Sequence, residues 1–234
     1  MFLPIVLAVY YLVPYKVKNI VLLIASLFFY AWGEPVYIIL MILSIVFNYF
    51  CGRDIKAKEE DPRRAKFAVI FAIAGNLLIL GFFKYYGFLI ETVNSILPTD
   101  IPYRELALPV GISFYTFQAI SYIMDVYWKR AEAQKNIIYF ALYISMFPQL
   151  IAGPIVRYAD IEEQLIKRKM SASKIGAGSM YFIMGLAKKA VLANTAGAVF
   201  EEISEMAAGN LSILTAWIGV FSYAFQIYFD FSGY

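Results

Sequence analysis

The sequence contains no histidine, a single cysteine and few charged residues, only 16% of the chain. The lone thiol, Cys51, can form neither an internal disulfide nor, without histidine or a second thiol, a zinc site. The hydrophobic content of 62% exceeds the roughly 45–50% that is typical of soluble domains. A net charge of +3, with the basic residues beside apolar runs, does not indicate a nucleic-acid-binding surface. The composition therefore predicts an integral membrane protein with no metal site and no nucleic-acid partner.

Long uncharged runs predict an all-α fold, a polytopic bundle of transmembrane helices in a lipid bilayer. About 20 apolar residues are needed to cross the hydrocarbon core as a helix. No internal repeat is evident, so residues 1–234 are interpreted as a single membrane domain. The expected spans cover residues 2–15, 20–32, 36–51, 67–83 with a continuation to 96 left open, 106–128, 175–200 and 207–234, with a re-entrant segment at 136–156.

The distribution of basic residues predicts how these spans are oriented. The segments 52–66, 129–135 and 157–174 are rich in lysine and arginine, and basic loops of this kind stay in the cytoplasm. The acidic segment 201–205 then falls on the other face. This pattern predicts a multi-pass protein of the cell's inner or plasma membrane with its N-terminus outside.

The run 106–128 carries polar side chains on one side. At 100° per residue, Tyr115, Gln118 and Asp125 share one face of a helix. Lipid offers a carboxylate or an amide no partner, so this face should point to the protein interior or to a watery cavity. Asp125 either holds a neighbouring helix through hydrogen bonds or contributes to a polar tunnel.

Prolines interrupt the run 136–156. Pro148 and the Gly153-Pro154 pair disfavour a straight helix, because proline lacks a backbone donor and restricts the residue before it. Both flanks are basic, so both ends should lie on the cytoplasmic side. The pattern predicts a proline-broken segment that enters and leaves by the same face, with a buried turn that lines a cavity.

Polar residues also interrupt the last two runs. Lys188 and Lys189 are costly at membrane depth, so they mark either a pathway through the membrane or a helix boundary that leaves them in the cytoplasm. Ser222, Gln226 and Asp230 are spaced four residues apart and share one helix face. On this evidence Asp230 can be an interfacial carboxylate whose only role is hydrogen bonding.

Three segments resemble the signature segments of the membrane-bound O-acyltransferase family, within its alginate O-acetyltransferase branch. They are LPVGISFYTFQAISYIMDVYW, MFPQLIAGPIVRY and the closing FQIYFDFSGY, together with GLAKKAVLA at 185–193. The resemblance implies an O-acyltransferase that moves an acetyl group from a cytoplasmic donor towards an extracytoplasmic polysaccharide, alginate-like or another cell-surface glycan. The donor would be acetyl-CoA or another acyl compound bound as a substrate, with no bound cofactor. An extracytoplasmic acetyltransferase is the implied partner.

Members of the family are longer than this sequence, and the histidine taken as catalytic in the family lies beyond Tyr234. The resemblance therefore implies that these 234 residues contain no catalytic residue and are incomplete and inactive alone. They would supply scaffold, tunnel wall and the mouth on the donor side. The residues implied to line the tunnel or contact substrate are Tyr115, Gln118, Asp125, Gln149, Arg157, Lys188, Lys189, Gln226, Asp230, Ser232 and Tyr234.

Several of these residues keep two interpretations. Arg157 either grips a phosphate or carboxylate of the acyl donor or acts as one more positive anchor on the cytoplasmic side. Direct proton transfer by Asp230 is a further role, although the sequence shows no neighbouring base to support it.

Two other functions fit the same features. A secondary transporter or flippase also has polar helix faces and broken helices. A noncatalytic membrane scaffold that only binds a partner is the third hypothesis. Transport of a solute in vesicles without acyl transfer would distinguish the first from an acyltransferase.

Overall fold

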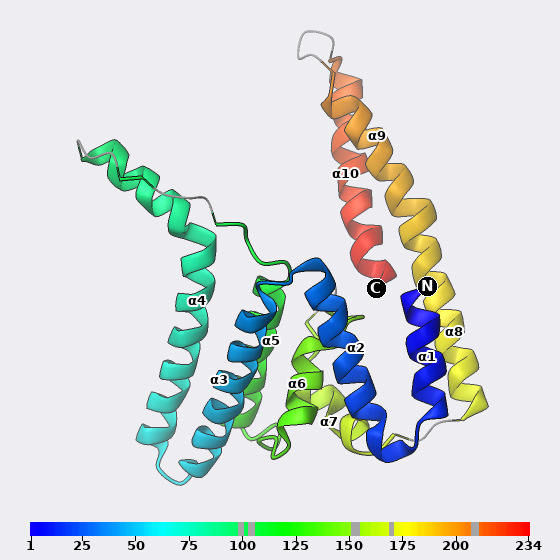
Figure 1. Ribbon diagram of the computed structural model, residues 1–234. Coiled ribbons are helices and arrows are strands. Elements are labelled where there is room, and N and C mark those ends of the chain that lie inside the picture. The colour runs from blue at the N-terminus through cyan, green and yellow to red at the C-terminus, as the bar shows by residue number, and fades with distance from the viewer. Residues whose placement is uncertain (98–100, 103–105, 151–154, 169–170, 207–210) are drawn as a thin grey trace. The chain divides into compact units, whose positions relative to one another are not determined.

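The computed structural model describes residues 1–97, 101–102, 106–150, 155–168, 171–206 and 211–234, and these contain helices and no strand (Figure 1). Within them, four helices are long and apolar enough to cross a membrane: Tyr15–Gly33, Ile38–Ala57, Pro62–Ile96 and Ala172–Ser204. The chain is therefore an all-helical membrane protein, as the sequence predicts. The helices are α1 (Phe2–Leu12), α2 (Lys18–Gly33), α3 (Ile38–Ala57), α4 (Pro62–Ile96), α5 (Ile112–Tyr127), α6 (Ile137–Ser145), α7 (Tyr158–Ile166), α8 (Ala172–Ala187), α9 (Asn194–Ser204) and α10 (Ile213–Gly233), with a 3₁₀ turn at Tyr15–Val17 and a π-helical segment, η2, at Lys188–Ala193.

The helices form two compact units, Met1–Arg168 (unit 1) and Lys169–Tyr234 (unit 2). In unit 1, α5 packs against α3, α4, α6 and α7, and α2 packs against α6. In unit 2, α10 packs against α8, η2 and α9. The expectation of a single membrane domain stays a prediction.

Helices α3 and α4 form a hairpin whose turn lies within the basic segment 52–66. The end of unit 1 that carries this turn is called the basic end below. The carboxylate of Asp61 caps α4 by accepting hydrogen bonds from the backbone N–H groups of Arg63 and Arg64, and Pro62 opens the helix. Helix α4 then continues without a break to Ile96, and its last turns bend away from the rest of the helix (Figure 1).

Two asparagines inside apolar runs hold this hairpin together. The side chains of Asn48 on α3 and Asn76 on α4 donate a hydrogen bond to each other's carbonyl oxygen, at 3.0 and 2.7 Å. Both residues are buried. A polar pair of this kind joins helices in lipid, where apolar surfaces alone gain little by association.

Helix α5 is shorter than the run 106–128 from which it was expected. It begins at Ile112, because Pro109 precedes it and Gly111 adopts a left-handed conformation with φ of 77° at the N-cap. A Cβ atom at Gly111 would lie 2.9 Å from the carbonyl oxygen of Leu150, so the close approach of these two segments also requires glycine.

The segment between Gln134 and Tyr158 begins and ends at the same end of unit 1. Helix α6 ends at Ser145, three residues before Pro148. Tyr158, the first residue of α7, accepts a hydrogen bond at 2.7 Å from the side chain of Gln134, which precedes α6. The two ends of the segment therefore meet, which is the geometry of a re-entrant segment. The Gly153-Pro154 pair lies outside the described residues.

In unit 2, α8, η2 and α9 follow one another as a single interrupted helix that lies against α10. Gly185 and Gly233 lie at the closest approach, where a Cβ on Gly233 would stand 2.9 Å from the Gly185 carbonyl oxygen. The π-helical segment is a single widened turn, a feature that is frequent at functional sites.

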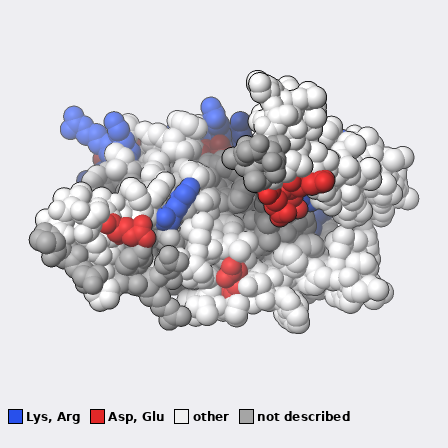
Figure 2. Space-filling view, turned by 90° about the horizontal axis from the view of Figure 1, so that it is seen from above, with Lys and Arg blue, Asp and Glu red and all other residues white. Residues whose placement is uncertain are grey.

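The outer surface is largely apolar. Figure 2, which views the molecule from the end opposite the α3–α4 turn, shows mostly uncharged side chains. Large apolar residues are exposed along the long helices, such as Trp32 at 81% and Leu78 at 73%. A soluble protein rarely exposes apolar surface on this scale, so lipid is its natural neighbour.

The contact between α3 and α5 depends on the absence of a side chain at Gly52. A Cβ there would lie 2.5 Å from the hydroxyl of Tyr122, whose ring is fully buried and cannot move aside. We expect Gly52→Ala to lower the free energy of unfolding in detergent by about 1–3 kcal/mol.

Gly81→Ala is the matched control, because a Cβ at this helical glycine of α4 meets nothing within 4 Å. It should be neutral or stabilising by up to about 1 kcal/mol. Equal losses in both variants would contradict the packing of α3 on α5.

Candidate functional site

The predicted site residues of unit 1 meet around the broken end of α6. The last carbonyl groups of a helix have no partner within the helix and need one from elsewhere. The carbonyl oxygen of Tyr143 accepts a hydrogen bond from the side-chain amide of Gln118 at 2.9 Å and another from that of Gln149. The structure thus brings together Gln118 and Gln149, which lie 31 positions apart in the sequence. Their amides fasten the re-entrant segment to α5.

Other polar contacts complete this arrangement. The hydroxyl of Tyr143 donates to the carbonyl oxygen of Val156 at 3.0 Å, beyond the proline-containing turn. The backbone N–H of Phe147 donates to the hydroxyl of Ser26 on α2 at 3.2 Å. The residues Gln118, Gln134, Tyr143, Gln149 and Tyr158 are called the polar layer below.

Sequence reasoning missed Gln134, Tyr143 and Tyr158. Gln134 lies in a short polar segment that indicates only a loop. From the sequence alone, a buried tyrosine cannot be distinguished from a tyrosine of an interfacial belt. In the structure, Tyr122, Tyr143 and Tyr158 form a buried aromatic cluster with ring centroids 5.1 and 5.2 Å apart.

The polar face predicted for α5 is buried. Tyr115, Gln118 and Asp125 are each less than 5% exposed. Asp125 Oδ2 has no hydrogen-bond partner among the described residues. A buried carboxylate oxygen without a partner is costly, so Asp125 can still accept a hydrogen bond from a bound group.

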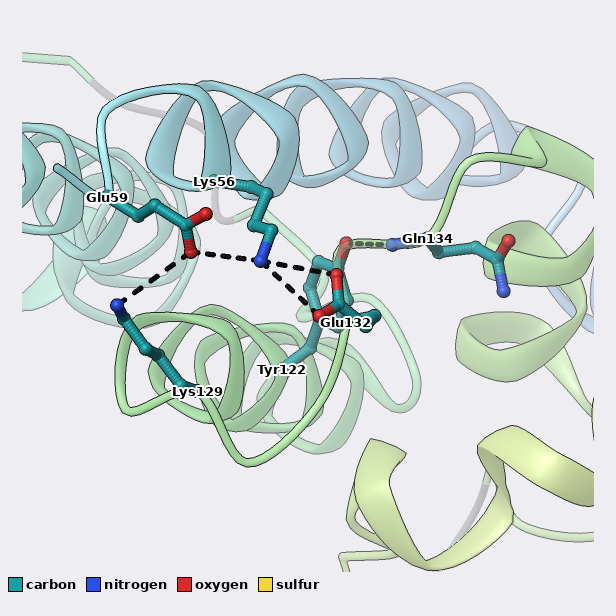
Figure 3. Close-up of polar contacts among 6 residues, drawn as sticks. All are labelled: Lys56, Glu59, Tyr122, Lys129, Glu132 and Gln134. Carbon is teal, nitrogen blue, oxygen red and sulfur yellow. Dashed lines mark hydrogen bonds and ion pairs between the residues drawn. The ribbon is translucent and has the colours of Figure 1, made fainter.

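A cluster of charges lies at the basic end of unit 1 (Figure 3). Lys56 Nζ lies 2.9 Å from Glu59 and 3.3 Å from Glu132, and Lys129 lies 4.0 Å from Glu59. The hydrogen bond from Lys56 holds the pKa of Glu59 below its ordinary value. These charges satisfy one another, so the cluster ties the α3–α4 turn to the loop after α5.

Beside this cluster, the hydroxyl of Tyr122 accepts a hydrogen bond from the backbone N–H of Gln134 at 3.1 Å (Figure 3). Glu162 lies nearby on α7, and its partial burial raises the pKa of its carboxyl group.

Arg157 directly precedes α7, and its side chain is exposed. It is not one of the residues of the polar layer. Its side chain makes no ion pair with any residue in the described ranges. The guanidinium group is therefore available to an anion from outside the chain, a state that fits both interpretations of this residue.

The predicted residues of unit 2 lie together at η2 and the end of α10. Lys189 Nζ forms an ion pair with Asp230 Oδ1 at 2.5 Å, and Lys188 Nζ donates to the carbonyl oxygen of Ser232 at 3.1 Å. Both lysines lie inside the candidate span Ala172–Ser204. Asp230 therefore has a cationic partner that the sequence did not reveal.

The remaining predicted residues of unit 2 lie along α10. Gln226 packs against Gly197 of α9, where a Cβ would come within 2.8 Å of its side-chain nitrogen. Tyr234, the last residue, is half-exposed. Within the described ranges, no group of three or more histidine, cysteine, aspartate or glutamate residues could hold a metal ion.

The chain is similar in sequence to several O-acetylases. No family model matches it. It is 39% identical over 238 residues to the probable alginate O-acetylase AlgI of Pseudomonas aeruginosa, an alignment that covers 100% of this chain and 45% of that protein. It is 36% identical to the probable alginate O-acetylase AlgI of Azotobacter vinelandii, over 100% and 47% of the two chains.

A third relative acts on a different polymer. The peptidoglycan O-acetyltransferase of Helicobacter pylori is 34% identical over 265 residues, which cover 100% of this chain and 50% of that protein. The chain spans about half the length of the curated relatives that it matches.

The ion pair between Lys189 and Asp230 should stabilise unit 2. We expect Lys189→Met and Asp230→Leu each to lower the free energy of unfolding by about 1 kcal/mol, because each leaves one charge without its partner among apolar helices. The double variant should lose less than the sum of the two. Thermal unfolding of the purified protein measures all three.

Lys84→Met serves as the control for a lysine without an ion pair among the described residues, and it should change stability little. Strictly additive losses in the double variant would contradict an interaction between Lys189 and Asp230.

Proposed function

The chain is homologous over its whole length to O-acetylases of the membrane-bound O-acyltransferase family, and we propose that it forms part of an enzyme that O-acetylates a cell-surface polysaccharide. The acetyl group would come from a cytoplasmic donor, acetyl-CoA or another acyl compound bound as a substrate. It would pass towards an extracytoplasmic glycan, alginate-like or another polymer, or towards a partner acetyltransferase. The observation that carries this proposal is the alignment of all 234 residues with acetylases of two different polysaccharides.

The chemistry of acetyl transfer divides between binding and proton transfer. A base must activate the acceptor hydroxyl, and hydrogen-bond donors must stabilise the developing oxyanion. These 234 residues contain no histidine, so a histidine base would have to come from outside them. The described residues fit a scaffold role, because the amides of Gln118 and Gln149 hold the re-entrant segment in place through the Tyr143 carbonyl oxygen.

The basic end of unit 1 is the proposed docking side for the donor. Arg157 is exposed there and has no ion pair in the described ranges, and its planar guanidinium can bind a phosphate or carboxylate with two hydrogen bonds. In this proposal the protein lies in the cell's inner or plasma membrane with this end in the cytoplasm and its N-terminus outside, because basic loops stay inside.

The acceptor assignment is tested in a strain that lacks the gene. We expect its surface polysaccharides to lose O-acetyl esters, as measured by NMR before and after mild alkaline treatment, and the wild-type gene to restore them. Comparison of exopolysaccharide and peptidoglycan fractions identifies the acceptor. An unchanged ester content in both fractions would count against the proposal.

Arg157→Ala, introduced into the complete enzyme, tests the donor side. Loss of a charge-assisted hydrogen bond should raise the KM for acetyl-CoA about tenfold with a smaller effect on kcat, and Arg157→Lys should raise it less. Lys167→Ala is the matched control, since Lys167 is another exposed basic residue at the far end of α7. If all three variants keep the wild-type KM, Arg157 is only a positive anchor.

A further inference from the structure

A cavity of about 160 Å³ lies in unit 1 where the α1–α2 connection meets the residues after α7. Its lining includes Lys16, Lys18 and Arg168, and none of its lining residues is acidic. Three cations around a cavity of this size create a positive potential that favours an anion. The proposed acetyl transfer does not use these residues.

Hydrogen bonds between segments that are distant in the sequence hold Arg168 in place and join the two sides of the cavity. The hydroxyl of Tyr15 accepts a hydrogen bond from the backbone N–H of Arg168 at 2.8 Å, and Arg168 Nη1 donates to the hydroxyl of Tyr10 at 3.1 Å. The side chain of Asn19 donates to the carbonyl oxygen of Leu165 at 2.9 Å. About 150 positions separate these partners in the chain, so the fold itself assembles the basic cavity.

The ring of Tyr10 stabilises two of these cations through cation–π contacts. Lys18 Nζ lies 4.6 Å from the ring centroid of Tyr10, and the guanidinium carbon of Arg168 lies 5.7 Å from the same centroid. Lys18 is only 6% exposed. A lysine this buried is unusual, and it keeps a strong field inside the cavity.

The location of the cavity suggests which anions reach it. It lies at the start of α2, at the same end of unit 1 as the α3–α4 turn, and beside helices whose apolar faces are exposed (Figure 1). This is the level at which lipid headgroups meet a membrane protein, and basic pockets between spanning helices bind phosphorylated headgroups.

We propose that Lys16, Lys18 and Arg168 form a binding site for a phosphate group. The guanidinium of Arg168 supplies a fork of donors that matches phosphate oxygens, and the two ammonium groups supply charge. The phosphate belongs either to the headgroup of an anionic phospholipid or to a soluble phosphate compound from the aqueous side.

Native mass spectrometry of the purified protein in a neutral detergent tests the proposal. The lipid probe is anionic phosphatidylglycerol, the reference is phosphatidylcholine, which is zwitterionic with no net charge, and the soluble probe is inorganic pyrophosphate. We expect the apparent Kd for the bound probe to rise roughly fivefold for each charge removed, in Lys16→Gln and then in the Lys16→Gln and Arg168→Gln double variant. Lys18 is left unchanged because it is buried.

Lys66→Gln is the matched control, an exposed lysine on α4 that does not line the cavity. Phosphatidylglycerol binding that depends on Lys16 and Arg168 identifies a lipid site, and dependent pyrophosphate binding identifies a soluble ligand. The proposal is overturned if neither probe binds in preference to phosphatidylcholine, or if Lys66→Gln weakens binding as much as Lys16→Gln. Melting temperatures of the variants, measured without lipid, show whether each one is folded.

Discussion

Every polar group at membrane depth must find its partner within the protein, and the packing of unit 1 follows from this constraint. Breaking α6 at Ser145 leaves carbonyl groups without partners, and the amides of Gln118 and Gln149 supply them at Tyr143. The broken segment is stable because these partners come from α5 and from the segment itself.

The same constraint acts on the charged and amide groups elsewhere. Asn48 and Asn76 satisfy each other across the α3–α4 hairpin, and Lys189 and Asp230 do so in unit 2. Asp125 is the contrast, because its buried Oδ2 has no partner among the described residues. This oxygen is therefore an acceptor that a bound molecule can use.

The basic end of unit 1 carries charges with different tasks. Lys56 and Lys129 are engaged with Glu59 and hold the helical ends together. Arg157 and Arg168 form no ion pair with another residue within the described ranges. A donor with phosphate groups and anionic lipid would both be drawn to this end, so the proposed donor side and the proposed phosphate site reinforce each other electrostatically.

The sequence by itself determined the class of the protein, its helical content and the interruption of the run 136–156, because hydrophobic length and proline act locally. It also placed Gln118 and Asp125 on one buried face, because helix periodicity is local too. Only the tertiary structure decided that α5 begins at Ile112, that Gln118 binds the Tyr143 carbonyl, and that Lys189 pairs with Asp230. These contacts depend on how separate helices pack against one another. Every residue has a backbone carbonyl group, so the sequence does not indicate which carbonyl accepts a given hydrogen bond.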